Sequence, residues 1–138
     1  MKNFSPQQIK DLHELPVVDL IHYWDEVETA ASKDGKLEQA VRLLVGVDLY
    51  YLLVRICGRR DMLPCVDRPG FIDNQFAFDR CREVEANPDG FLDLWAREHW
   101  KSSIITFGKT VQDILNDPEV TFGIFSHTRP IAKAFLRQ

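Results

Sequence analysis

One octapeptide has basic and hydroxyl side chains at a spacing suited to binding an anion: Ala96-Arg97-Glu98-His99-Trp100-Lys101-Ser102-Ser103. In phosphate-binding loops with the pattern G-x-x-x-x-G-K-[ST], the lysine contacts the β- and γ-phosphates of a nucleotide and the next hydroxyl ligates Mg²⁺. Lys101 and Ser102 stand at these two places. The spacing therefore predicts that the octapeptide binds a nucleotide, with Ser102 as the metal ligand.

Both glycines of the pattern are replaced, the first by Ala96 and the second by Trp100. Glycine adopts a left-handed backbone without steric cost, whereas another L-residue costs roughly 1–2 kcal/mol in that conformation. If the loop needs this backbone at Trp100, the tryptophan would weaken nucleotide binding or change the shape of the loop. The alternative interpretation is a polar loop whose serines cap a helix and whose Trp100 packs on the surface.

The elements around the octapeptide are predicted from apolar patterns and turn residues. FLDLWA, residues 91–96, follows the turn ANPDG and is typical of a buried strand, whereas SSIITFGKTVQDILND, residues 102–117, predicts a helix of about four turns. PEVTFGIFSH, residues 118–127, predicts a second strand, and a last helix begins near Thr128. The order β-α-β-α is typical of an α/β fold with a parallel sheet. The helix after the octapeptide would direct its unpaired N–H groups at a phosphate.

The part of the chain before the predicted sheet is expected to be helical. We place the boundary so that residues 1–88 form a helical N-terminal subdomain and residues 89–138 an incomplete P-loop core. Predicted helices cover residues 6–15, 17–34, 37–58 and 72–85, with Ser5 as the first N-cap and Gly35 as a break. The apolar helix over residues 37–58 contains Arg42, Asp48 and Arg55, and each charge would be expensive in hydrocarbon. We therefore expect a helix buried among other helices rather than a membrane span.

The composition bounds the class of protein. A chain of 138 residues with 45% hydrophobic content is long enough for one domain with its own core. The formal charge of -4, from 21 acidic and 17 basic residues, excludes a global basic field for non-specific nucleic-acid binding. Cys57, Cys65 and Cys81 have no zinc-site spacing and are expected to be reduced thiols. The first residues do not form a secretion signal, so a cytosolic setting is expected.

The segment from about residue 71 to residue 138 resembles the start of the ATPase domain of tailed-phage terminase large subunits, the motors that package viral DNA. The resemblance rests on DRCREVEANPDGFLDLWAREHWKSSIITFGKTVQDILNDPEVTFGIFSHTRPIAKAFLRQ. In that family the phosphate loop is commonly a deviant Walker A motif, with a small residue first, an arginine second, and Lys-Ser or Lys-Thr at the end. Ala96, Arg97, Lys101 and Ser102 match these places.

The resemblance implies a fold and an activity. It implies a helical subdomain followed by the truncated β-α-β-α start of a P-loop NTPase sheet, with ATP and Mg²⁺ as cofactors. Arg97 would be the catalytic residue, contacting the γ-phosphate, where a guanidinium stabilises the charge that develops on phosphoryl transfer. The alternative for Arg97 is a surface ion pair with Glu98, Asp93 or Asp89, which contributes little to stability. The implied partners are the small terminase subunit, the portal protein and double-stranded DNA, in the cytoplasm of a bacterial host.

Other residues are weaker candidates. Ser126, His127, Thr128 and Arg129 follow the second predicted strand, where α/β sheets bind ligands, but helix capping explains two of them. His99 beside Glu98 suggests acid–base chemistry, yet no nucleophile stands at a defined spacing. By the resemblance, Gln75 or a neighbouring aromatic residue would contact the adenine.

The residues after the octapeptide include no strand that ends in the acidic pair that such an ATPase needs for Mg²⁺ and water. The clustered carboxylates of the family's nuclease domain are also not found. We therefore expect an N-terminal fragment of a terminase large subunit that binds a nucleotide weakly and does not hydrolyse it. Two alternatives stay open: a non-enzymatic helical interaction module, and a prophage remnant with a vestigial nucleotide loop.

Overall fold

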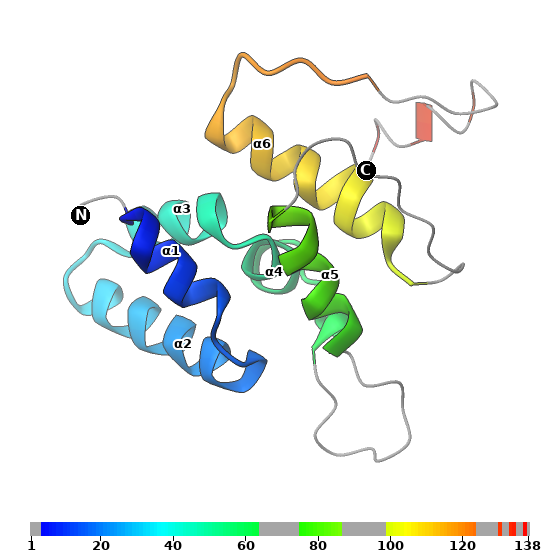
Figure 1. The fold of residues 1–138 in the computed structure, drawn as a ribbon. Coiled ribbons are helices and arrows are strands. Elements are labelled where there is room, and N and C mark those ends of the chain that lie inside the picture. Colours follow the sequence, from blue (N-terminus) through cyan, green and yellow to red (C-terminus); the bar gives the residue numbers. More distant parts are fainter. Residues whose placement is uncertain are drawn as a thin grey trace.

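The computed structural model describes residues 4–63, 75–86 and 99–123, with the single positions 130, 133, 134 and 137. The regular elements of these residues are helical (Figure 1). The α-helices are α1 (Pro6–His13), α2 (Val17–Lys33), α3 (Leu37–Val47), α4 (Leu49–Tyr51), α5 (Gln75–Ala86) and α6 (Thr110–Asn116). Two π-helical segments, η1 (Leu52–Ile56) and η3 (Ser102–Lys109), and one 3₁₀ turn, η2 (Arg60–Met62), complete the described elements.

The first two helices begin where the sequence predicts, and they end at His13 and Lys33, two residues and one residue before the predicted ends. The Ser5 hydroxyl accepts from the Gln8 backbone N–H at 3.2 Å and the Ser5 N–H donates to the Gln8 side chain at 2.8 Å, which is a capping box. Helix α2 follows Pro16 directly and ends at a turn in which Gly35 has φ +66°. Proline restricts the backbone where a helix starts, and glycine adopts the left-handed backbone of the turn where a helix ends. The boundaries predicted at Ser5, Pro16 and Gly35 are therefore confirmed.

The long apolar helix predicted over residues 37–58 is interrupted at Asp48. Its backbone is extended there, with φ -137° and ψ 99°, and its carboxylate accepts from the Tyr51 N–H at 3.0 Å. Aspartate is a poor interior residue of a helix and a good N-cap, so it ends α3 and starts α4. The chain then continues through η1 and leaves it at Gly58, with φ +69°. In the part of the chain that is described, no helix combines the length and the apolar character that crossing a bilayer requires.

The core is built around large aromatic side chains from three helices. Trp24, Tyr50 and Tyr51 are fully buried, and the Trp24 ring lies edge-on to Tyr51 at 5.3 Å between centroids. Phe78 of α5 packs edge-on against Tyr50, also at 5.3 Å. Both tyrosine hydroxyls have acceptors, the Met62 carbonyl at 2.7 Å and the Glu28 carboxylate at 2.6 Å. Such rings bury much apolar area when their polar atoms are paired, as they are here.

The helix formed by η3 and α6 lies across the core beside α3, α4 and α5 (Figure 1). It confirms the helix predicted from residue 102, although its first turns are π-helical rather than α-helical. Ile104 is fully buried. Gly108 permits a close approach, because a Cβ atom there would lie 2.7 Å from Leu53 Cδ2. Side chains of α6 also reach α3, with Gln112 donating to the Val45 carbonyl at 3.2 Å and Asn116 to the Gly46 carbonyl at 2.9 Å.

The predicted α/β fold with a parallel sheet is wrong for the described residues, which contain helices and no strand. In the second predicted strand, Pro118 and Glu119 form a turn and residues 120–123 have no regular structure. Phe122 is 39% exposed, and a β-branched or aromatic run forms a strand only where another strand and a core receive it. Residues 91–96, the first predicted strand, and residues 124–129 lie outside the described residues.

Candidate functional site

The octapeptide is described only from His99 onward. Lys101 and Ser102 are exposed, and they begin the helix that runs through η3 and α6, as the sequence predicts. Ser103 is half-buried in the same turn. The remaining predicted site residues, Ala96, Arg97 and Glu98, lie outside the described residues.

Trp100 has a left-handed backbone. Its φ is 55°, and it is the one non-glycine residue with positive φ among the described positions, where Gly35 and Gly58 share that sign. Its carbonyl accepts from the Ile104 N–H at 2.8 Å, so Trp100 occupies the N-cap place of the helix. The left-handed conformation therefore occurs where the phosphate-loop pattern has its second glycine, and the tryptophan bears a cost of roughly 1–2 kcal/mol.

Four polar side chains hold this turn, and we call them the Asp61 clamp: Arg59, Asp61, Trp100 and Ser103. The Trp100 indole N–H donates to Asp61 Oδ2 at 2.7 Å. Arg59 donates twice to Asp61, from Nε to Oδ1 at 3.1 Å and from Nη2 to Oδ2 at 3.0 Å. Its third nitrogen, Nη1, donates to the Ser103 hydroxyl at 2.9 Å. These bonds from Arg59 outweigh burial and, with the bond from Trp100, lower the pKa of the Asp61 carboxyl.

Two weaker candidates have structural contacts. The His99 ring packs edge-on against Phe76 of α5, at 5.3 Å between centroids. Gln75, predicted near the adenine, donates to the Asp79 carboxylate on the same helix at 2.8 Å. Neither contact brings a nucleophile to His99 or Gln75.

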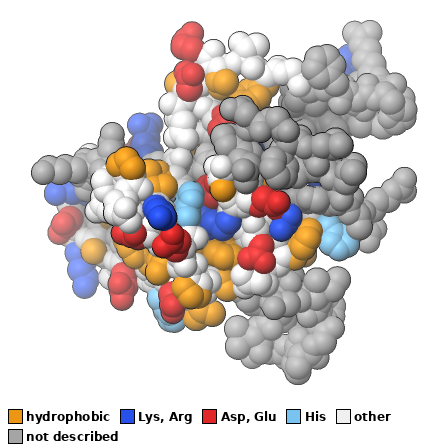
Figure 2. Space-filling view, in the orientation of Figure 1, with side chains coloured by type: hydrophobic (Ala, Val, Ile, Leu, Met, Phe, Trp, Pro, Cys, Tyr) orange, Lys and Arg blue, Asp and Glu red, His pale blue; other side chains and the backbone are white. Residues whose placement is uncertain are grey.

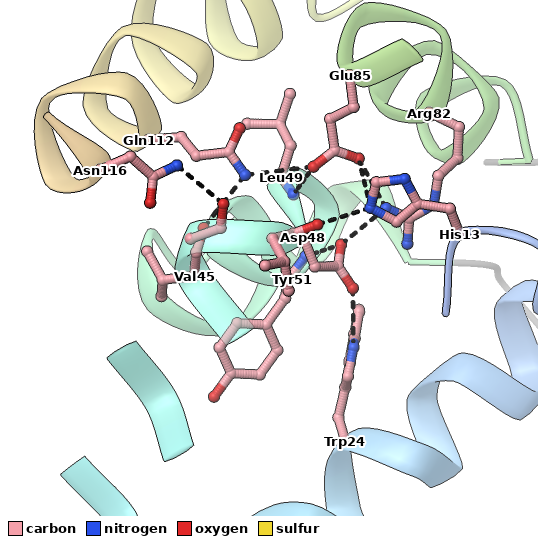
Figure 3. A network of polar contacts seen from close by, with 12 residues as sticks. His13, Trp24, Val45, Asp48, Leu49, Tyr51, Arg82, Glu85, Gln112 and Asn116 are labelled. Carbon is pink, nitrogen blue, oxygen red and sulfur yellow. Dashed lines mark hydrogen bonds and ion pairs between the residues drawn. The ribbon is translucent and has the colours of Figure 1, made fainter. Parts of the chain in front are cut away.

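A second polar cluster, which the sequence analysis missed, lies in the core at the break between α3 and α4 (Figure 3). The fully buried Asp48 accepts from the Trp24 indole N–H at 3.0 Å and pairs with Arg82 Nη1 at 3.1 Å. The same Arg82 nitrogen lies 2.7 Å from Glu85, whose carboxylate also accepts from the Leu49 N–H at 2.6 Å. Burial raises the pKa of Glu85, Arg82 opposes this shift, and the nearby Asp48 carboxylate adds to it.

The buried cluster also joins α1 and α6. The His13 side chain donates from Nε2 to the Val47 carbonyl at 2.6 Å and lies 3.6 Å from Glu85. Gln112 of α6 donates to Glu85 at 3.2 Å. Because its carboxylates are enclosed and paired with protein donors, this cluster is suited to joining helices rather than to binding a substrate. No group of three or more His, Cys, Asp or Glu side chains that could hold a metal is found within the described residues.

A groove runs between α2 and η1 and has a volume of about 530 Å³. Its lining is apolar with basic residues, including Val18, Ile21, Val54, Leu63, Arg55 and Arg60. Val18, which lines the groove, is 53% exposed. Arg60 comes from η2, the same turn that carries Asp61.

Charged side chains of both signs are interspersed on the face that Figure 2 shows, where Lys and Arg lie beside Asp and Glu. Ion pairs between exposed side chains also occur among the described residues, as between Lys10 and Glu14 at 3.7 Å. Comparisons of the chain with protein-family models, with curated proteins and with solved structures each find no match. Function is therefore inferred from the residues of the octapeptide and the side chains that hold them.

Proposed function

We propose that this chain is the N-terminal portion of a DNA-packaging motor of the terminase large-subunit type, and that Lys101, Ser102 and Ser103 bind the phosphates of Mg-ATP. The proposal starts from the resemblance of the segment from about residue 71 to residue 138 to the start of the ATPase domain of terminase large subunits. It includes the family's setting, the cytoplasm of a bacterial host, and its partners, the small terminase subunit, the portal protein and double-stranded DNA. The predicted sheet is not part of it.

The observation that carries the proposal is the left-handed backbone at Trp100. A loop that only capped a helix would have an ordinary N-cap, such as the extended backbone of Ser5, with φ -72° and ψ 157°. Trp100 instead bears a strained conformation at the second of the two places where the phosphate-loop pattern uses glycine. This supports the phosphate loop over a helix cap, because capping alone would not require the strain.

The residues present fit a bound triphosphate. An exposed ammonium at Lys101 and an exposed hydroxyl at Ser102 stand at the start of a helix, where the macrodipole and the first N–H groups favour anions. Mg²⁺, held through Ser102 and the phosphates, would neutralise charge on the phosphate oxygens. Arg97 is proposed to contact the γ-phosphate on the strength of the resemblance.

Calorimetric titration with Mg-ATP tests the proposal. We expect wild-type protein to bind and Lys101→Ala to bind at least about tenfold more weakly, because a charge-assisted hydrogen bond to phosphate is lost. Lys33→Ala is the matched control, since Lys33 is an exposed lysine in the last turn of α2. Equal heats for the wild type and Lys101→Ala would exclude specific binding at this loop.

A second candidate is a helical interaction module, and the groove between α2 and η1 favours it. Its apolar floor with Arg55 and Arg60 fits an amphipathic segment with acidic residues, and the small terminase subunit is the partner to test. We expect Val18→Lys to abolish binding of that subunit, whereas Leu37→Lys, at an exposed leucine outside the groove, leaves it unchanged. Binding that survives Val18→Lys would rule the groove out as the docking surface.

A further inference from the structure

Trp100 presents a physical problem for the proposed nucleotide site, because a bulky residue does not stay left-handed without support. We propose that Asp61 is a positioning residue that replaces the missing glycine. Its carboxylate holds the indole N–H of Trp100, and so keeps residue 100 left-handed and the start of the helix turned toward the phosphates. The inference rests on the proposed function of Lys101 and Ser102.

The geometry of the Asp61 clamp supports this role. The indole–carboxylate bond is 2.7 Å long, and the carboxylate is itself held by both sides of the Arg59 fork, at 3.1 and 3.0 Å. The remaining Arg59 nitrogen reaches the Ser103 hydroxyl at 2.9 Å. Both ends of the turn from Trp100 to Ser103 are thus tied to one arginine–aspartate pair. Bidentate, charge-assisted hydrogen bonds fix the orientation of the Asp61 carboxylate, and an oriented acceptor is what keeps the strained backbone of Trp100 in place.

The turn that carries Asp61 is anchored in the core. The Met62 side chain is fully buried, its N–H donates to the Arg59 carbonyl at 3.0 Å, and its carbonyl accepts from the Tyr50 hydroxyl at 2.7 Å. Asp61 therefore sits on a fixed support, although its own side chain is 52% exposed. A fixed support with an exposed carboxylate can position a neighbouring loop.

The tryptophan is suited to being held in this way. Trp100 is half-buried and packs against the hydrophobic core, and its indole has a single N–H donor. Ring packing limits where the donor can point, and Asp61 occupies that direction at hydrogen-bond distance. The nucleotide loop is consequently coupled to the helical core through residues that lie 39 and 44 positions earlier in the chain.

A double-mutant cycle on Mg-ATP affinity tests the inference. In the wild-type background, Asp61→Asn is expected to weaken binding about tenfold, which corresponds to the loss of one good charge-assisted interaction. In a Trp100→Gly background, the same change is expected to have no effect, because glycine adopts the left-handed backbone unaided. Trp100→Phe keeps the ring and loses the donor, so it should weaken binding like Asp61→Asn, with no further loss when the two are combined.

The matched control is Asp25→Asn, which alters another exposed arginine–aspartate pair, Asp25 with Arg55, and should leave affinity unchanged. Far-ultraviolet circular dichroism shows whether each variant is folded. If Trp100→Gly does not fold, the cycle is carried out with Trp100→Phe in its place. If the wild type binds Mg-ATP and Asp61→Asn leaves the affinity unchanged, the inference about Asp61 is wrong. The same holds if Asp61→Asn weakens binding equally in the wild-type and Trp100→Gly backgrounds. Neither result contradicts the proposed function. Absence of Mg-ATP binding by the wild type overturns the proposed function and the inference with it.

Discussion

Two tryptophans in this chain make the same hydrogen-bonded arrangement in opposite surroundings. Trp24 donates its indole N–H to Asp48, which pairs with Arg82, and Trp100 donates to Asp61, which pairs with Arg59. The Asp48 side chain is 0% exposed, whereas that of Asp61 is 52% exposed. The two groups share their residue types, and they differ in their access to water.

Because of this difference in exposure, the buried group contributes to the stability of the fold, whereas the exposed group contributes to the position of a loop. In the core, water cannot replace a lost partner, so removing one member of the group leaves buried donors unsatisfied. At the surface, water replaces the partner and the ion pair itself contributes little to stability. The value of the exposed group is conformational, because it holds the strained backbone of Trp100, directly before Lys101 and Ser102. The buried group joins helices, and the exposed group orients a loop.

The largest expected effect comes from breaking the buried group. Asp48→Ala removes the acceptor of the Trp24 indole and of the Tyr51 N–H and a partner of the buried Arg82, and should lower the free energy of unfolding by about 3–5 kcal/mol. Asp61→Ala, the same change in the exposed group, should cost less than about 1 kcal/mol. Urea denaturation measures both, and similar losses in the two variants would contradict the distinction.

A middle-sized effect is expected where the helix that carries Ser102 and Ser103 packs on the core. Gly108→Ala would place a Cβ atom 2.7 Å from Leu53 Cδ2 and 3.1 Å from the Ser103 carbonyl, so overpacking should cost about 1–3 kcal/mol. Gly46→Ala is the control. Its Cβ would meet only the end of the Asn116 side chain, which can move, and alanine favours the helix. If thermal denaturation gave equal losses for both variants, the close packing at Gly108 would not be the cause.

The smallest effect is a difference in pH dependence. The pKa of buried Glu85 is raised above its ordinary 4.5, so its contribution to stability is fully present below that value and is lost as pH rises through the raised pKa. The pKa of Asp61 is lowered below 3.8, so its contribution is present above that value and is lost as pH falls through the lowered pKa.

Unfolding free energies measured between about pH 3 and 7 separate the two signs. The stability of the wild type relative to Glu85→Gln should fall as pH rises from about 4.5, and its stability relative to Asp61→Asn should fall only toward the acid end, by less than about 1 kcal/mol. Equal slopes for the two differences would show that the two carboxylates do not differ in environment.

Much of the helical structure could be predicted from local signals. Ser5 with Pro6, Pro16 and Gly35 mark boundaries through their own backbone and capping chemistry, which needs no distant contact. The run over residues 118–123 misled, because β-branched and aromatic residues indicate a strand only when a neighbouring strand and a core are present. The single helix predicted over residues 37–58 was wrong at Asp48 for a similar reason, since apolar periodicity alone does not reveal that a charged residue will act as an N-cap.

Adjacent residues are enough to establish the spacing of Lys101 and Ser102, the helix that they begin, and the absence of glycine at residue 100. The folded chain is needed to show that Trp100 is left-handed, that Asp61 accepts from its indole N–H, and that Arg59 donates to Ser103. These partners are far apart in the chain and meet because the turn after Gly58 is anchored in an aromatic core. Hydrogen bonds between residues far apart in the chain depend on tertiary packing, and local sequence patterns do not reveal that packing.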